Sequence, residues 1–270
     1  MRIDYRISAV KPYINWDYFY FAWGVHNKPA EEKQKLRDEA ENLLQKYGWH
    51  YQTHAVFLLL DANSDGDDII VWEKEKEEKT WRLPFLRQQQ GSPCLCLADF
   101  IRPLSSGVRD QLGIFATTAD RGMEQDFDDD PYEKLMMQLL ADRLAEATAE
   151  RLHKEVRQTY WGYAQQEHLP MNELHVETFQ GIRPAVGYPS LPDTSFNFLL
   201  NDVLDMSQIG ITLTESGAMK PHASVSGLMM AHPQSRYFDI GKIDEHQLAD
   251  YARRRGMPID VVRKFLISNL

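Results

Sequence analysis

The segment Gly181-Ile-Arg-Pro-Ala-Val-Gly-Tyr-Pro-Ser-Leu-Pro192 contains three prolines and two glycines in twelve residues. Because proline lacks an amide hydrogen and fixes φ, this composition excludes a regular helix or a central strand. We therefore predict an ordered loop whose stiff backbone holds Arg183 and Tyr188. A guanidinium held in this way suits paired hydrogen bonds to a carboxylate or a phosphate. A proline-rich connector with an ordinary surface arginine is the alternative that the composition leaves open.

Helical and extended patterns lie on both sides of this loop. The clearest helix is predicted over residues 131–160: three aspartates before it offer an N-cap, Pro131 fits the first helical position, and Gly162 lies just past the end. The other predicted elements are helices over 30–47, 195–205, 244–255 and 258–268, and strands over 55–60, 68–72, 94–100, 111–118, 211–215 and 224–230. Alternating charges over 73–79 indicate a solvated turn or edge. Because no repeat or low-complexity linker divides these elements, we expect one α+β domain over residues 1–270.

The composition narrows the class of protein. With 43% hydrophobic residues, the chain can bury a substantial core, which excludes global disorder. The net charge of −10 argues against nucleic acid as the main partner and suits a cationic ligand or a basic protein. No apolar stretch approaches the roughly 20 residues of a membrane span, and the N-terminus lacks the apolar core of a secretory signal. Cys94 and Cys96 are too few for a zinc site, so we expect reduced thiols in a cytoplasmic protein without a membrane partner or a bound metal.

Two short motifs resemble metal or cofactor sites but favour simpler interpretations. Residues 61–66 begin like a calcium-binding loop, yet the twelfth position, which must supply a carboxylate, is Trp72. We therefore predict a hairpin turn there. Residues 244–249 resemble an Asp-x-His-x-x-Gly corrinoid motif, but Ala249 replaces the glycine within a predicted helix, which favours a surface histidine at 246. The chain also lacks a Gly-x-Gly-x-x-Gly fingerprint, which counts against a Rossmann-type methyltransferase or dinucleotide oxidoreductase.

An acidic stripe runs along the predicted helix over 131–160. Asp142, Glu146 and Glu150 share one face at four-residue spacing, where like charges repel slightly. Neutralisation by Lys154 and Arg157 is the interpretation that the spacing favours. A cationic ligand is the alternative.

Several motifs, in one order along nearly the whole chain, resemble the C-terminal activation domain of cobalamin-dependent methionine synthase. They are 13–16 (YINW), 66–69 (GDDI), 97–100 (LADF), 141–147 (ADRLAEA), 160–163 (YWGY), 181–193 (GIRPAVGYPSLPD), 213–219 (LTESGAM), 223–227 (ASVSG), 232–238 (HPQSRYF) and 247–257 (QLADYARRRGM). The resemblance implies a twisted, mainly antiparallel sheet flanked by helices. It also implies an S-adenosylmethionine-binding domain that supports reactivation of oxidised cobalamin. In that reaction flavodoxin or a similar reductase supplies one electron, and S-adenosylmethionine then supplies the methyl group.

The resemblance also implies roles for individual residues. Arg183 would hold the carboxylate of S-adenosylmethionine, the backbone near Ala185 would contact the adenine, and Tyr188 would form a wall of the pocket. Acidic positions near the ligand's two cations match Glu146 and Glu177. An aromatic pair on the adenosine side matches Tyr237 and Phe238, where the family sometimes has a tyrosine in place of Phe238.

The chain departs from the family pattern at two further places. Asn15 stands where the family usually has an aspartate that pairs with the ligand's ammonium group. The exchange should weaken binding by about 1 kcal/mol unless Asp17 substitutes. The usual Ala-Cys-Pro-Asp/Glu-His of the loop is Ser190-Leu-Pro-Asp-Thr194 here, so a histidine expected near the cobalamin face is missing.

The sequence shows none of the homocysteine, folate or cobalamin modules that accompany this domain in the family's usual arrangement. We therefore expect an activation subunit that docks in trans onto a cobalamin-binding methionine synthase chain, with cobalamin reached only through that partner and no turnover in isolation. An S-adenosylmethionine sensor or scaffold, and a reactivation subunit for another corrinoid protein, are the alternatives.

Overall fold

The computed structural model describes residues 1–73 and 76–270. Strand β3 ends at Glu73 and strand β4 begins at Lys76. The turn or edge predicted over 73–79 therefore falls partly outside the described residues.

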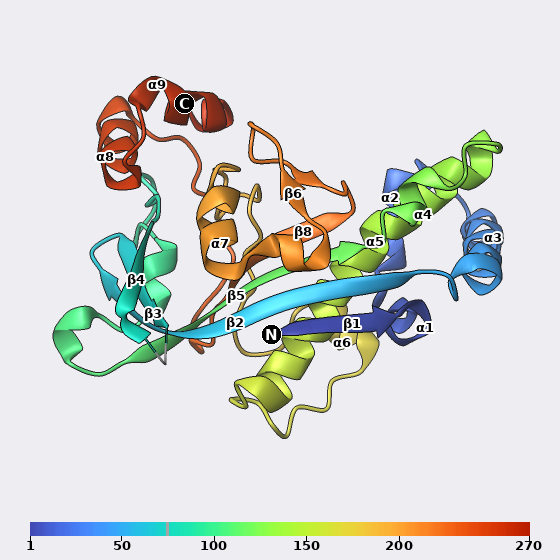
Figure 1. Ribbon diagram of the computed structural model, residues 1–270, viewed down its shortest axis with the longest axis horizontal. Coiled ribbons are helices and arrows are strands. Elements are labelled where there is room, and N and C mark those ends of the chain that lie inside the picture. The colour runs from blue at the N-terminus through green and yellow to red at the C-terminus, as the bar shows by residue number, and fades with distance from the viewer. Residues whose placement is uncertain (74–75) are drawn as a thin grey trace.

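A six-stranded sheet forms the centre of the molecule (Figure 1). Its strands follow the order β4-β3-β2-β5-β8, with β1 also paired to β2, and every pair is antiparallel. The strands are β1 (Arg2–Arg6), β2 (Gln52–Asp65), β3 (Asp68–Glu73), β4 (Lys76–Pro84), β5 (Asp110–Ala119) and β8 (Ser224–Met229). A separate two-stranded sheet contains β6 (Thr212–Leu213) and β7 (Met219–Lys220). The predicted α+β class with a mainly antiparallel sheet is confirmed.

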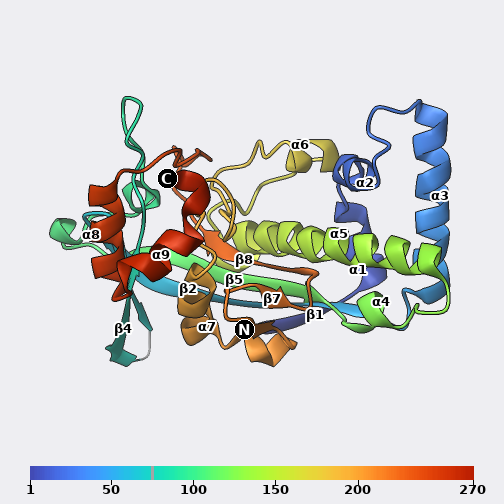
Figure 2. The same ribbon diagram turned by 90° about the horizontal axis from the view of Figure 1, so that it is seen from above.

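Helices cover both faces of the sheet (Figures 1 and 2). They are α1 (Ile7–Val10), α2 (Trp16–Ala22), α3 (Ala30–Tyr47), α4 (Gly122–Gln125), α5 (Pro131–Glu155), α6 (Met171–His175), α7 (Phe196–Leu204), α8 (Glu245–Arg255) and α9 (Ile259–Phe265). Side chains alternate between the faces along β2: Ala55 and Phe57 join a core with α5, whereas Val56 joins a core with α7. This alternation explains the continuous apolar run in the central strands, because both faces are buried.

Helix α5 crosses one face of the sheet along its length (Figure 2). Asp130 caps it by accepting hydrogen bonds from the amides of Tyr132 (2.9 Å) and Glu133 (3.2 Å), as the sequence predicts. Two buried threonines fix it to the sheet. Thr117 donates to the Ala145 carbonyl at 3.0 Å, and Thr148 donates to Thr53 Oγ1 at 2.7 Å. The helix continues as a π-helical turn, Val156–Tyr160, so the predicted end of the helical segment is correct although its last turn is not α-helical.

The hairpin between β2 and β3 replaces the calcium loop that residues 61–66 resemble. Asp65 pairs with Asp68 across the turn, and Gly66 has a φ of 63°. The hairpin prediction is thus confirmed. At 94–100 the strand prediction is wrong, because Leu97–Phe100 is a 3-10 helix. Its first turn is closed by Asp99, which accepts from the Cys96 amide at 2.8 Å, and Arg87 pairs with the same carboxylate at 2.6 Å.

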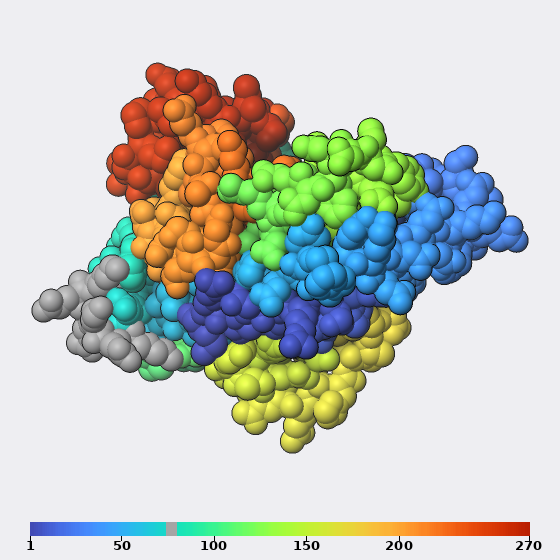
Figure 3. All heavy atoms as spheres, turned by 45° about the vertical axis from the view of Figure 1, so that its right-hand side comes forward, coloured from blue at the N-terminus to red at the C-terminus, as the bar shows by residue number. Residues whose placement is uncertain are grey.

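The N-terminal part of the chain contains elements that the sequence patterns did not reveal, among them a strand and a helix. Strand β1 pairs with β2 from Arg2 opposite Val56 to Arg6 opposite Gln52, and α2 occupies the aromatic block after Asn15. Figure 3 shows the N-terminal residues, in dark blue, at the surface beside the yellow-green segment that follows α5.

The strand predicted over 211–215 is shorter than expected, since only Thr212–Leu213 is extended.

The Gly181–Pro192 loop adds an irregular extension to the edge of the sheet at β8. Ile182 exchanges two backbone hydrogen bonds with Met230, at 3.0 and 2.9 Å, and the Pro184 carbonyl accepts from the Leu228 amide at 3.0 Å. A Cβ at Gly227 would overlap the Pro184 carbonyl oxygen, so only glycine allows this close approach. The loop is therefore ordered by the sheet, and Arg183 lies between two anchored residues.

The C-terminal helices α8 and α9 form a small core of their own near β4. The Asp193 carboxylate joins them to the loop: it pairs with Arg255 at 2.6 Å and accepts from the Tyr251 hydroxyl at 2.8 Å. Asp193 and Arg255 are almost completely buried. His246 is exposed on α8, as the surface interpretation predicts. No helix in the described parts of the chain is both long and apolar enough to cross a membrane.

Candidate functional site

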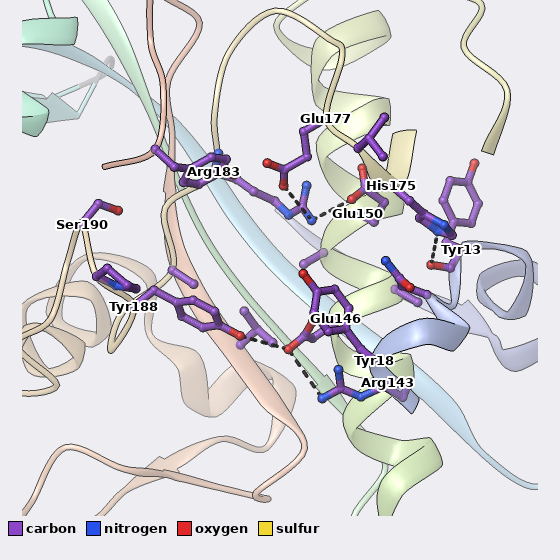
Figure 4. A pocket seen from close by; sticks show the side chains of 18 of the residues that line it. Tyr13, Tyr18, Arg143, Glu146, Glu150, His175, Glu177, Arg183, Tyr188 and Ser190 are labelled. Atoms are coloured by element: carbon purple, nitrogen blue, oxygen red, sulfur yellow. Dashed lines mark hydrogen bonds and ion pairs between the residues drawn. The ribbon is translucent and has the colours of Figure 1, made fainter. Parts of the chain in front are cut away.

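A cavity of about 720 Å³ opens where α5, the Gly181–Pro192 loop and the N-terminal segment meet (Figure 4). Its size lies within the roughly 300–1,000 Å³ of small-molecule sites. Every residue that the resemblance assigns to the ligand contributes to its walls: Asn15, Glu146, Glu177, Arg183, Ala185, Tyr188, Tyr237 and Phe238. The fold thus brings together residues that lie more than two hundred positions apart in the chain.

Arg183 has a mostly buried side chain, 17% exposed, that points toward α5 (Figure 4). Its Nη2 lies 2.7 Å from Glu150 Oε2 and 3.9 Å from Glu177 Oε1. Its Nη1 is buried and has no hydrogen-bond partner among the described residues. Burial would lower the pKa of this arginine, but Glu150, Tyr237 and Glu177 outweigh that effect and raise it. The guanidinium is therefore charged, and one of its two terminal nitrogens has no partner among the described residues.

Glu150 is the second half of this ion pair and is more deeply buried, at 7% exposed. Its Oε1 is also buried without a partner in the described structure. A buried polar atom left unpaired costs about 1–3 kcal/mol. Arg183 and Glu150, which each carry such an atom, both line the cavity.

Tyr188 connects the loop to α5 across the cavity. Its hydroxyl donates to Glu146 Oε1 at 3.2 Å, and Arg143 Nη2 lies 3.7 Å from the same oxygen (Figure 4). Burial and the nearby Glu146 raise the pKa of Tyr188 to about 12, so the hydroxyl remains a neutral donor. The ring is still half exposed and forms a wall at the cavity opening.

Glu177 reaches the cavity from the segment after α6 and has a φ of 56°, an unusual value for a residue other than glycine. Burial raises the pKa of its carboxyl group, although Arg183 opposes the change. Two residues earlier, His175 also lines the cavity, and its Nε2 lies 3.2 Å from the Tyr13 carbonyl oxygen.

Tyr237 and Phe238 lie on the loop side of the cavity. The Tyr237 hydroxyl accepts from the Arg183 amide at 3.0 Å, which fixes the backbone of the arginine as well as its side chain. Burial raises the pKa of Tyr237 to about 12. Phe238 packs near Phe100, with ring centroids 6.3 Å apart.

Asn15 lines the cavity but also caps α2. Its side-chain Oδ1 accepts from the Asp17 amide at 3.1 Å. Asp17 itself is exposed and does not line the cavity, so its position does not favour the substitution that the sequence left open. Thr194, which stands where the family usually has a histidine, donates to the Ser216 carbonyl at 3.2 Å.

The acidic stripe on α5 is neutralised differently from the favoured sequence interpretation. Lys154 lies over the Tyr13 ring, and Arg157 pairs with Glu167 at 2.7 Å. The partners of the stripe come from Arg183, Arg143 and His222 instead. Two of these lie far along the chain, so spacing within the helix could not identify them.

His153 lies behind the site and is completely buried, with both ring nitrogens unpartnered in the described structure. Burial lowers its pKa well below the ordinary value, and the charges of Arg157 and Arg183 act in the same direction. The imidazole is therefore neutral at physiological pH.

Sequence reasoning missed Arg143, Tyr13, Tyr18 and His175 as cavity residues, and it assigned no ligand role to Glu150. The acidic stripe was the available signal for Glu150. Tyr13 and Arg143 lie in the family motifs that also contain Asn15 and Glu146, and those motifs were their signal. For Tyr18 and His175 there was no signal, because their position depends on how α2 and α6 pack around α5. In total, four carboxylates and two guanidiniums line the cavity, which gives these six groups a formal charge of −2. Such a surface favours a ligand that carries positive charge.

Comparison with known proteins agrees with this geometry. Residues 6–256 match the family described as vitamin B12 dependent methionine synthase, activation domain. Among solved structures, the fold is similar to that of the MetH reactivation domain bound to AdoHcy, with a TM-score of 0.94 and 37% sequence identity. The match covers 100% of this chain and 90% of that chain. The chain therefore belongs to the family of vitamin B12-dependent methionine synthase activation domains.

Proposed function

We propose that this protein binds S-adenosylmethionine and supports the reductive remethylation of cobalamin on a cobalamin-binding methionine synthase chain. The observation that carries the proposal is the free, buried Nη1 of Arg183 in an acidic cavity lined by all eight residues that match the family's ligand site. AdoHcy, S-adenosylhomocysteine, is what remains after S-adenosylmethionine gives up its methyl group, and a similar domain binds it.

The cavity suits the parts of this ligand one by one. Arg183 Nη1 would hold the carboxylate through a charge-assisted hydrogen bond. The backbone at Ala185 would contact the adenine, and the rings of Tyr237 and Phe238 would pack on the adenosine side. Glu146 and Glu177 would favour the sulfonium through their charge.

When bound, S-adenosylmethionine supplies the methyl group, and cobalamin is supplied by the partner chain. The task of this protein is to fix the orientation of the ligand. Its backbone at Arg183 is held by Tyr237 and the adjacent Ile182 by Met230, so little rearrangement is needed on binding. Flavodoxin or a similar reductase would supply the electron that precedes methyl transfer, in the cytoplasm.

Calorimetric titration with S-adenosylmethionine tests the binding step. We expect Arg183→Ala to weaken binding by about 10- to 100-fold, because it removes a hydrogen bond between charged groups. Arg236→Ala is the matched control: Arg236 is exposed, lies next to Tyr237 and does not line the cavity. If the unaltered protein gives no binding at millimolar ligand, or if both variants bind equally well, the assignment is wrong.

Reconstitution tests the reactivation step and the expectation that the chain acts in trans. The protein is mixed with S-adenosylmethionine, a one-electron donor and a separately supplied methionine synthase that holds cob(II)alamin. We expect the absorbance of methylcobalamin to appear only when all components are present. Binding of S-adenosylmethionine without reactivation would favour an S-adenosylmethionine sensor or scaffold. Reactivation of a different corrinoid protein would favour a reactivation subunit for that protein.

A further inference from the structure

The ion pair between Arg183 and Glu150 leaves one atom of each partner unused. Arg183 Nη2 and Glu150 Oε2 lie 2.7 Å apart, while Arg183 Nη1 and Glu150 Oε1 are both buried and unpartnered among the described residues. The ion pair therefore contains one unpaired cationic donor and one unpaired anionic acceptor at the wall of the cavity.

An α-amino acid carries the complementary arrangement, because its carboxylate and its ammonium group are attached to the same carbon. The carboxylate would meet Arg183 Nη1, and the ammonium would then lie on the side of Glu150 Oε1. Each contact is a charge-assisted hydrogen bond in a buried setting, where such bonds are strongest. Arg183 and Glu150 together could thus bind both charged groups of an α-amino acid.

Asn15 is a weaker partner for the ammonium group than a carboxylate. Its Oδ1 accepts from the Asp17 amide at 3.1 Å, and the opposite orientation of the side-chain amide would place two donors against each other. That bond uses one of the two lone pairs of Oδ1, and the NH₂ group can only donate. An ammonium group could therefore use only the second lone pair of this neutral oxygen, which is a weaker bond than one to a carboxylate.

The other two glutamates of the cavity are weaker candidates. Glu146 already accepts from Tyr188 at 3.2 Å. Glu177 is 35% exposed and lies 3.9 Å from Arg183, and burial raises its pKa, which makes its charge easier to lose. Glu150 is the most buried of the three and is held in place by Arg183.

We propose that Glu150 is the residue that binds the ammonium group of the ligand's amino-acid end and so makes the site specific for an α-amino acid. This inference rests on the proposed function, since it assumes a ligand with an amino-acid end at Arg183.

The test compares two ligands by calorimetry: S-adenosylhomocysteine and its analogue with hydrogen in place of the α-amino group. We expect the unaltered protein to prefer the amino compound by about 10-fold or more, the value of a charge-assisted bond. Glu150→Gln should reduce the preference to about threefold or less. The ratio of the two affinities is the informative quantity, because any disturbance of Arg183 weakens the binding of both ligands together.

Two variants that leave Glu150 in place serve as controls. Asn15→Ser keeps an oxygen that can cap α2 but removes the NH₂ group, and Glu177→Gln removes the competing charge. Both should keep the preference for the amino compound. If either loses it while Glu150→Gln retains it, the inference is overturned. The same holds if the unaltered protein binds both ligands equally.

The outcomes for the two proposals are distinguishable. Failure of the proposed function appears as no binding of either compound to the unaltered protein. Failure of this inference appears as binding with the wrong dependence on Glu150. Should Glu150→Gln not fold, as judged by circular dichroism, a loss of preference in Asn15→Ser or Glu177→Gln still overturns the inference, and retention in both supports Glu150.

Discussion

At the scale of single residues, the position of Arg183 depends as much on its neighbours' backbone as on its own side chain. Ile182 and Pro184 are bonded to β8, and Tyr237 accepts from the Arg183 amide. The guanidinium is thus presented by the edge of the sheet, which is more rigid than an isolated loop.

Gly227 is the residue on β8 that makes this attachment possible. In Gly227→Ala the new methyl group would overlap the Pro184 carbonyl and push the loop away from the strand. We expect a loss of about 1–3 kcal/mol in the free energy of unfolding, typical of overpacking, together with weaker binding of S-adenosylmethionine. Urea unfolding and calorimetry on the same preparation check this. Unchanged affinity would show that the attachment does not position Arg183.

At the scale of elements, α5 carries three charged residues of the site, Arg143, Glu146 and Glu150, and its N-cap is the clearest local signal in the chain. Asp130→Ala removes the hydrogen bonds to Tyr132 and Glu133 and should cost about 1 kcal/mol. A thermal melt should show a midpoint lower by about 2–4 °C. Asp129→Ala, an exposed aspartate without a capping bond, should leave the midpoint unchanged. Equal shifts in both variants would contradict the capping role.

The elements also show which parts of the structure were predictable. Helix α5 was predicted well because its cap, its first proline and its terminating glycine are all local signals. The 3-10 helix at Leu97–Phe100 was missed because the hydrogen bond that Asp99 accepts from the Cys96 amide, reinforced by Arg87, outweighs the apolar pattern of a strand. Strand β1 was missed because its pairing with β2 joins residues about fifty positions apart.

Loop composition alone pointed to Arg183 and Tyr188, whereas the rest of the candidate site was predictable only through the family resemblance. All eight residues found in this way line the cavity, yet the pairing of Glu150 with Arg183 is invisible in the sequence. The two residues lie on different elements, and only the packing of the loop against α5 brings them together. The sequence shows which residue types are present; the distances between them depend on the tertiary structure.

At the scale of the whole molecule, His54 joins the start of the chain to the end of β5. Its Nδ1 lies 2.6 Å from Asp4 and its Nε2 2.9 Å from Asp120. The bond to Asp120 is the largest effect on the pKa of His54 and raises it above its ordinary value of 6.5, although burial opposes the change. Burial likewise opposes ionisation of the two carboxyls, but their bonds with His54 help to lower both pKa values below 3.8.

These directions fix the pH dependence of stability. The contribution of His54 is complete below pH 6.5 and is lost as the pH rises through its raised pKa, while the contribution of the carboxyls is lost as the pH falls through their lowered values. We expect His54→Gln to lower the free energy of unfolding by about 2 kcal/mol at pH 6 and by clearly less at pH 9. Urea unfolding at both pH values measures the difference. An effect that does not change with pH would rule out a charged His54.

The C-terminal helices depend on one buried ion pair. Asp193→Asn leaves Arg255 buried without a counter-charge and should lower the free energy of unfolding by about 3–5 kcal/mol. It should also expose the arginines of α8 to trypsin. Arg253→Ala removes only an exposed pair with Asp250 and should cost at most about 1 kcal/mol. Comparable losses in the two variants would show that the buried pair does not hold these helices.

The proline content of the loop along β8 affects how the molecule meets other proteins. An exposed strand edge is a template on which foreign chains can add further strands, and it invites aggregation. Here the edge is already occupied by Ile182–Val186, and Pro184 has no amide hydrogen to offer a newcomer. The same residues that hold the arginine thus cap the sheet, so that another protein can approach this side through side-chain recognition without risk of intermolecular β-pairing.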